Sequence, residues 1–179
     1  MTDAHAADEQ VAIRPAAAAD MPAITAIDAE GLATGHATFR AEPHNTTSFT
    51  AAFGDPGFAL VAERAGAIVA WAGIAPTSAR AVYRGVGEVS IYVAGSARGR
   101  GVGRLLLTAL VAASERAGYW TLVAQVFPEN AGSVAFHEAA EFRTVGVRER
   151  LGPMEYGSAA GRWRDVVMLE RRSAKVGWD

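Results

Sequence analysis

The segment Arg98-Gly99-Arg100-Gly101-Val102-Gly103-Arg104 places the strongest constraint on how this chain can fold. It follows a strand pattern at residues 87–94 and opens the clearest helix pattern of the chain, residues 102–117, which Gly118 ends. Closely spaced glycines let backbone N–H groups approach a ligand without a Cβ atom in the way. A helix start adds unpaired N–H donors and a positive dipole end. The segment therefore predicts a pyrophosphate-binding loop; a glycine-rich turn with solvated arginines is the simpler alternative.

Two common phosphate-binding motifs do not fit this segment. A Rossmann pattern, Gly-x-Gly-x-x-Gly, that begins at Gly99 would need a third glycine where Arg104 stands. A P-loop would need a lysine directly after Arg104, and Leu105 stands there instead. The pattern that remains is Arg-x-x-Gly-x-Gly at Arg98, Gly101 and Gly103.

The rest of the chain alternates strand and helix patterns. We expect strands at residues 11–14, 58–64, 67–74, 119–127, 142–151 and 164–171. We expect helices from an Asp20 N-cap, with an early Pro22, to about residue 30, at residues 48–53 and at residues 130–140. This order predicts one α/β (α+β) domain over residues 11–172 on a mixed sheet, with a flexible tail at residues 1–10 and a short C-terminal tail at residues 173–179.

Composition excludes several classes of protein. Half of the 179 residues are hydrophobic, which is a globular balance, and no apolar run is long enough to span a membrane. The chain has no cysteine, so disulfides, thiolate metal sites and a cysteine nucleophile are excluded. A net charge of −2 argues against general nucleic-acid binding, and the histidines show no metal-ligand spacing. The polar, acidic start lacks a signal-peptide pattern, so we expect a cytoplasmic protein without a metal.

Several further motifs lie before and after this loop along the chain. They are Ile13-Arg14-Pro15-Ala16, Asp20-Met21-Pro22-Ala23-Ile24, Thr38-Phe39-Arg40-Ala41-Glu42-Pro43, Glu88-Val89-Ser90-Ile91-Tyr92-Val93, the Asn-x-x-Ser-x-x-x-His pattern at Asn130, Ser133 and His137, and Gly161-Arg162-Trp163-Arg164-Asp165-Val166. In these motifs and in the Arg-x-x-Gly-x-Gly loop the chain resembles the GNAT superfamily of N-acetyltransferases, in particular its phosphinothricin acetyltransferase-like branch.

The resemblance implies a single-domain GNAT fold, with a mixed, mainly antiparallel twisted sheet and helices on both faces. It implies acetyl-CoA as co-substrate, entering between two parallel strands that splay apart near residues 93 and 119–125. The cofactor-binding residues would be Ile91, Tyr92 and Val93 along the pantetheine arm, Arg98, Gly99, Arg100, Gly101, Val102, Gly103 and Arg104 at the pyrophosphate, and Asn130 and Ser133. From the residues alone, a helix N-cap is the better explanation of Asn130. Homodimers are common in the branch.

Glu88 is the candidate general base. Strand alternation puts Glu88, Ser90 and Tyr92 on one face, where a buried carboxylate is costly unless it is paired or used. An ammonium substrate must lose a proton before it attacks a thioester, and a carboxylate can accept that proton. The resemblance places the base at this position. A solvated glutamate is the structural alternative.

The substrate side is less constrained. The resemblance places His137 near the acyl group as an acid or a substrate contact. Because its helix is apolar, simple packing of the histidine is the structural alternative. Phe39 would form an apolar wall, and Arg80, Tyr83 and Arg84 would bind an anionic group. We expect direct acetyl transfer to the α-amine of a small amino acid of the phosphinothricin or methionine sulfoximine/sulfone type. Another amine, such as a protein N-terminus or polyamine, and a non-catalytic acyl-CoA-binding module are the alternatives.

Overall fold

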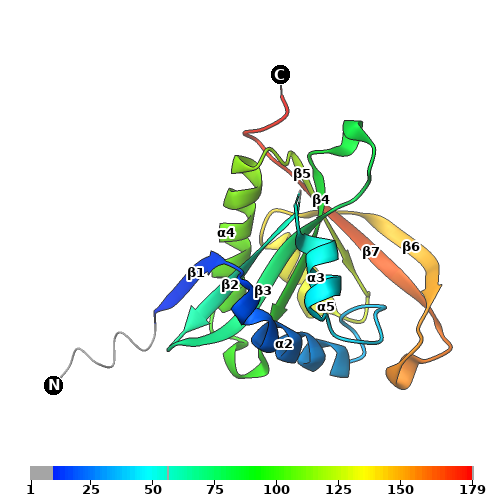
Figure 1. Cartoon of the computed structure of the whole chain (residues 1–179). Helices are drawn as coiled ribbons and strands as arrows, with labels where there is room; N and C mark the ends of the chain where they lie inside the picture. The colour runs from blue at the N-terminus through cyan, green and yellow to red at the C-terminus, as the bar shows by residue number, and fades with distance from the viewer. Residues whose placement is uncertain (1–9, 56, 179) are drawn as a thin grey trace.

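A seven-stranded sheet of order β1-β2-β3-β4-β5-β7-β6 forms the centre of the computed structural model, which describes residues 10–55 and 57–178 (Figure 1). Its strands are β1 (Val11–Pro15), β2 (Phe58–Arg64), β3 (Ala67–Pro76), β4 (Val86–Val93), β5 (Thr121–Val126), β6 (Arg143–Pro153) and β7 (Trp163–Arg172). Strands β4 and β5 run parallel, and the other neighbours run antiparallel. The predicted mixed, mainly antiparallel sheet is confirmed.

Helices cover both faces of this sheet, as predicted. They are α2 (Met21–Ala33), α3 (Thr46–Phe53), α4 (Val102–Arg116) and α5 (Ala131–Glu138), with short 3-10 turns η1 (Ala18–Asp20), η2 (Ala81–Tyr83), η3 (Gly95–Ala97) and η4 (Gly157–Ala159). Helices α4 and α5 pack on one face, and α2 and α3 pack on the other (Figure 1). None of these helices, in the part of the chain that the structure describes, is long and apolar enough to cross a membrane.

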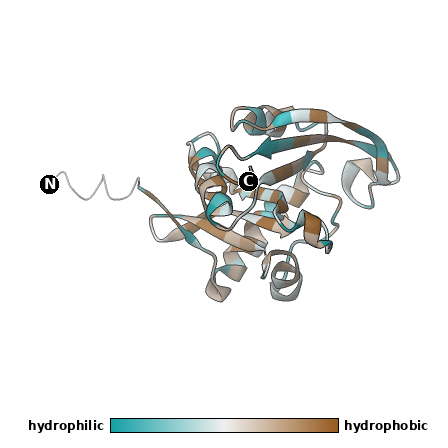
Figure 2. Cartoon of the chain, turned by 90° about the horizontal axis from the view of Figure 1, so that it is seen from above, coloured by the Kyte–Doolittle hydropathy of each residue, from teal (hydrophilic) through white to brown (hydrophobic). Residues whose placement is uncertain are grey.

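Strand β3 shows how alternation builds two cores at once. Ala70, Ala72 and Ile74 face α4, whereas the fully buried Trp71 faces α2 and α3. Its indole packs edge-on against the rings of Phe49 and Phe53. Apolar segments, brown in Figure 2, accordingly run through both the strands and the helices. The two cores hold the central strands rigidly, and these strands carry the site.

The parallel pair β4–β5 is short, and this decides where the site lies. Only three residue pairs align, Val86 with Thr121, Gly87 with Leu122 and Glu88 with Val123. Both strands then continue, β4 to Val93 and β5 to Val126, without pairing to each other. The predicted splay between parallel strands is therefore present, and it begins at Glu88, earlier than the sequence predicted.

The predicted Asp20 N-cap is wrong in its contact, although α2 begins at the next residue with Pro22 in its first turn. The Asp20 carboxylate makes no side-chain cap to α2. It instead accepts hydrogen bonds from Arg14 at 2.7 and 2.8 Å and from the Ala17 N–H at 2.8 Å. The bond from Arg14 holds the pKa of Asp20 below its ordinary value. Hydrogen bonds from Arg14 on β1 have thus taken the place of a side-chain cap on α2.

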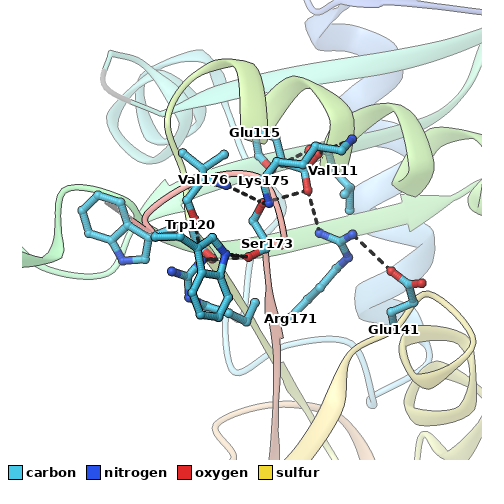
Figure 3. Close-up of polar contacts among 11 residues, drawn as sticks. Val111, Glu115, Trp120, Glu141, Arg171, Ser173, Lys175 and Val176 are labelled. Carbon is cyan, nitrogen blue, oxygen red and sulfur yellow. Dashed lines mark hydrogen bonds and ion pairs between the residues drawn. The ribbon is translucent and has the colours of Figure 1, made fainter.

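The C-terminal segment, predicted as a short tail, is held against α4 within residues 173–178 (Figure 3). Ser173 is buried, and its hydroxyl donates to Glu115 on α4 at 3.0 Å. Lys175 lies 3.0 Å from the other oxygen of Glu115, and the Trp178 indole donates to the Ser173 carbonyl at 2.8 Å. Composition could not reveal this, because the contacts of Ser173 and Lys175 depend on Glu115 of α4. The predicted N-terminal tail, apart from residue 10, lies outside the described residues.

Candidate active site

The splay between β4 and β5 opens into a cavity of about 1030 Å³. Many residues that the sequence singled out line it: Phe39, Glu88, Ile91, Tyr92, Val93, Arg98, Gly99, Gly101, Val102, Gly103, Arg104, Asn130, Ser133 and His137. They come from β4, the loop before α4, the first turn of α4, α5 with its N-cap, and the loop after α2. Four predicted site residues do not line this cavity: Arg80, Tyr83, Arg84 and Arg100.

The loop before α4 presents bare backbone at the cavity. Gly99 and Gly101 have φ angles of +71° and +78°, in the left-handed region that favours glycine. A Cβ atom at either position would meet nothing within 4 Å, so the space beside the backbone is open. Gly101 is the N-cap of α4 and provides no side-chain cap, which leaves the first-turn N–H groups available. The Arg98 and Arg104 side chains add positive charge at the same place. This arrangement suits a pyrophosphate.

Glu88 lies where the two strands part. Its carboxylate accepts a hydrogen bond from the Gln125 side-chain amide at 2.8 Å. Glu88 also lines a second, smaller cavity of about 340 Å³, together with Gln125, Tyr83, Ser78 and Arg148. A partly buried carboxylate that borders two cavities can receive a proton from a molecule in either one.

Tyr92 forms part of the apolar floor of the main cavity. Its ring stacks on Trp71 with centroids 4.9 Å apart and an interplanar angle of 13°. Burial, with a contribution from the charge of Asp28, raises the pKa of Tyr92 to about 12. The phenol therefore stays protonated at neutral pH. Gly31 makes this placement possible, because a Cβ atom there would lie 2.7 Å from the Tyr92 ring.

Two ion pairs, each with one buried partner, fix the loop after α2, which forms one wall of the cavity. Arg40 donates to both oxygens of Asp28 at 3.0 Å. Arg164, on β7, donates to Glu129 at 3.0 Å, to the Gly35 carbonyl at 3.2 Å and to the His36 ring at 3.1 Å. Sequence reasoning missed these pairs because no local pattern relates residues 28 and 40, or 129 and 164.

On α5, the three predicted residues contact one another. Asn130 caps the helix, as its Oδ1 accepts from the Ser133 N–H at 3.3 Å, and its Nδ2 donates to the His36 carbonyl at 3.3 Å. The buried His137 donates from Nδ1 to the Ser133 carbonyl at 2.8 Å. Burial lowers the pKa of His137, so the ring is neutral at pH 7. Its Nε2 is buried without a hydrogen-bond partner among the described residues.

The predicted anion-binding residues lie apart from the main cavity. The Arg80 guanidinium lies 5.5 Å from the centroid of the Tyr83 ring, and Arg84 lies 5.3 Å from that of Trp120. Tyr83 alone of these three lines the second cavity, and the arginine in that cavity is Arg148. Phe39 is placed as an apolar wall, and its ring packs edge-on against Phe127 at 4.8 Å. Residues 10–55 and 57–178 contain no cluster of three potential metal ligands.

Comparison with known proteins finds a matching family and several relatives of this chain. The model of the acetyltransferase (GNAT) family matches residues 26–142. A phosphinothricin N-acetyltransferase of Alcaligenes faecalis is 38% identical over 157 residues, covering 85% of this chain and 77% of the relative. An L-methionine sulfoximine/L-methionine sulfone acetyltransferase of Pseudomonas paraeruginosa is 28% identical over 88% of this chain and 92% of the relative.

A solved structure supports the same assignment. The crystal structure of a GNAT superfamily phosphinothricin acetyltransferase from Sinorhizobium meliloti, in complex with acetyl-CoA, matches with a TM-score of 0.83 and 29% identity. The match covers 94% of this chain and 91% of that one. With the splayed strands, the glycine loop and these relatives, the chain belongs to the GNAT acetyltransferase family and is an N-acetyltransferase.

Proposed function

We propose that this enzyme transfers the acetyl group of acetyl-CoA to the α-amine of a small amino acid or amino-acid analogue, of the phosphinothricin or methionine sulfoximine/sulfone type. The observation that carries the proposal is the position of Glu88, which lies where β4 and β5 part and borders both cavities. The substrates after which the two relatives are named supply the acceptor class.

The donor half of the site fits acetyl-CoA. The open backbone at Gly99 and Gly101, with the N-terminus of α4, provides N–H donors for the pyrophosphate. Beyond Glu88, the edge of β4 that faces β5 makes no ladder with it, so residues 91–93 can pair with the amide groups of the pantetheine arm. A cavity of about 1030 Å³ has room for the thioester end and for a small acceptor.

The reaction we propose is a direct transfer. Glu88 accepts a proton from the ammonium group, either directly or through a water molecule, and thereby frees the nitrogen lone pair. The amine then attacks the thioester carbonyl, a backbone N–H of β4 stabilises the oxyanion, and the C–S bond breaks to release CoA thiolate. The thiolate takes up the remaining extra proton of the nitrogen, which gives the neutral amide and free CoA. Because the chain has no cysteine, a cysteine acyl-enzyme has no place in this scheme.

The acceptor half is small and mixed in polarity. Phe39 and Phe127 form an apolar wall, and Ser78, Tyr83 and Arg148 supply polar groups in the second cavity. Such a pair of surfaces suits a short side chain that ends in an anionic or polar group. An anion contact by Arg80 or Arg84, a homodimeric state and a cytoplasmic location all stay predictions.

An acetylation panel tests this function. The protein is incubated with acetyl-CoA and, separately, phosphinothricin, methionine sulfoximine, methionine sulfone, free amino acids, a polyamine and a short peptide, while CoA release is followed. We expect turnover with phosphinothricin, methionine sulfoximine, methionine sulfone or free amino acids, and little turnover with the polyamine or the peptide. Efficient turnover of the peptide would instead favour a protein N-terminus as acceptor, and acetyl-CoA binding without any turnover would favour a non-catalytic module.

A further inference from the structure

Three polar side chains from three strands form a connected row at the point where the sheet opens. Glu88 lies on β4, Gln125 on β5 and Arg148 on β6, and all three line the second cavity. The Gln125 Nε2 donates to Glu88 Oε2 at 2.8 Å, and Arg148 Nη1 donates to Gln125 Oε1 at 3.1 Å. Arg148 reaches over β7, at a place where the register of β6 against β7 is irregular.

The chemistry of the two outer groups fixes the orientation of the amide between them. A guanidinium only donates hydrogen bonds, so it must meet the carbonyl oxygen of Gln125. An ionised carboxylate only accepts, so it must meet the NH₂ group. Turning the amide over would break both bonds at once. Gln125 is therefore held in one orientation, because its amide must accept a hydrogen bond at the oxygen and donate one at the nitrogen.

The place of Gln125 in the fold matches this role. The last residue pair of the parallel ladder is Glu88 with Val123, and Gln125 lies two residues further on, on the same face of β5 as Val123. It therefore reaches across the start of the gap between the strands. Within the described part of the chain, Gln125 is the one side chain that hydrogen-bonds to Glu88.

We propose that Gln125 is a positioning residue for Glu88 and that Arg148 fixes the orientation of Gln125. This proposal rests on the proposed function, in which Glu88 accepts the proton of the amine. The amide occupies Oε2 and leaves Oε1 free to face the acceptor. It also keeps the charge of Arg148 one side chain away, whereas an arginine in direct contact lowers the pKa of a carboxyl group and so weakens it as a base.

A purely structural role is the competing explanation, since the same bonds tie β5 to β6. The two roles differ in what the loss of the amide changes. A structural bridge affects stability and the fit of both substrates, and it acts independently of Glu88. A positioning residue affects kcat, and its effect vanishes once the group that it positions cannot work.

Steady-state kinetics of six variants separate these roles, with circular dichroism and thermal unfolding to verify the fold. Gln125→Met keeps the volume and removes both bonds. We expect kcat to fall about tenfold, as for loss of a hydrogen bond to a charged group, with KM for acetyl-CoA nearly unchanged. Gln125→Glu keeps the shape and the bond from Arg148 but cannot donate to an ionised Glu88. We expect its kcat to fall at least as far.

The double variant Glu88→Gln/Gln125→Met gives the decisive comparison. If Gln125 acts through Glu88, the double variant is no slower than Glu88→Gln alone. Arg148→Met should lower kcat by a smaller factor than Gln125→Met, because the amide loses only its anchor. Arg143→Met is the matched control on the same strand: Arg143 pairs with Glu170 and lines neither cavity, so its kcat should equal that of the wild type.

Two results would overturn the proposal while leaving Glu88 as the base. One is a folded Gln125→Met or Gln125→Glu enzyme with wild-type kcat. The other is a double variant whose loss equals the product of the two single losses. The single variant Glu88→Gln tests the base separately: if it kept most of the wild-type activity, the assignment of the base would fail, and the positioning role with it. The panel of amines tests the proposed function separately, and none of these variant results changes its outcome for the wild-type enzyme.

Discussion

Asp28 and Arg40 form a bidentate ion pair in which both Nη atoms of Arg40 lie 3.0 Å from the carboxylate oxygens of a completely buried Asp28. The same carboxylate accepts the N–H of His44 at 2.7 Å. Three donors thus satisfy one buried charge, as burial of a carboxylate requires. The pair ties α2 to residues 36–44, and Phe39 of this loop lines the main cavity. The wall on the acceptor side therefore depends on a carboxylate that itself lines neither cavity.

Replacing Asp28 by Asn should destabilise the protein and loosen this wall. Breaking a buried pair costs about 3–5 kcal/mol. Because the side chain of Arg40 is 32% exposed, we expect a smaller loss, about 2 kcal/mol. Urea unfolding measures the loss, and KM for the amine should rise while KM for acetyl-CoA stays near that of the wild type.

Glu170→Gln is the matched control for this prediction. It breaks the pair of Glu170 with Arg143, whose side chain is 69% exposed, so the stability should barely change. An Asp28→Asn protein as stable as the control would show that the buried pair does not hold the loop.

Sequence predicted those parts of the site that depend on local pattern. The loop at Gly99 and Gly101 is visible because glycine spacing, strand end and helix start coincide within a few residues. The alternation in β4 likewise puts Glu88 and Tyr92 on one face, which the structure confirms, because a strand sets side-chain direction by itself.

Long-range pairing could not be predicted in the same way. The partner of Asp28 lies twelve residues away across a loop, and Gln125 is separated from Glu88 by a whole helix. The Asp20 N-cap failed for the same reason, since Arg14 on β1 competes for its carboxylate. Conversely, Arg84 lies beside the site in sequence, yet its guanidinium lies over Trp120. Proximity along the chain predicts backbone geometry better than side-chain partners.

Gly101→Ala should weaken acetyl-CoA binding more than it weakens the fold. The variant places a Cβ atom in the open space beside the loop backbone and strains a φ of +78°. Gly66→Ala is a close match, because Gly66 has a φ of +74°, equally open surroundings and a position in the turn between β2 and β3.

Both substitutions should cost about 1 kcal/mol in unfolding free energy. Isothermal titration should find weaker acetyl-CoA binding in Gly101→Ala and wild-type affinity in Gly66→Ala. Equal affinities in the two variants would show that this backbone does not contact the co-substrate.

His137 should make the fold sensitive to mild acid. Burial lowers the pKa of His137 below 6.5, and burial together with Arg40 lowers the pKa of His44 as well. As the pH falls below about 6.5, the unfolded chain takes up protons that the folded protein resists, so the unfolding free energy falls. Each histidine contributes a slope of up to about 1.4 kcal/mol per pH unit in this window.

Urea unfolding between pH 5 and 8 measures this slope. The carboxyl groups with a lowered pKa, such as Asp20 and Glu115, contribute to this slope only when the pH is near or below their ordinary pKa values of 3.8 and 4.5. His137→Asn, whose amide can replace the Nδ1–H donor to the Ser133 carbonyl, should flatten the profile between pH 5 and 6.5. A profile as steep as that of the wild type would mean that His137 titrates normally in the folded state.

Glu88→Gln tests the proposed base directly. The glutamine keeps the shape and can still form a hydrogen bond with Gln125, but it cannot accept a proton. Loss of a general base is worth about 10²–10⁴ in rate, so kcat should fall by that order with acetyl-CoA affinity nearly unchanged. The deficit should shrink as the pH rises, because a growing fraction of the amine is then already deprotonated in solution. His137→Asn serves as the comparison, since the buried ring is neutral and its Nδ1–H is used by Ser133. If Glu88→Gln kept most of its activity at neutral pH while His137→Asn lost it, the proton would leave to His137 instead.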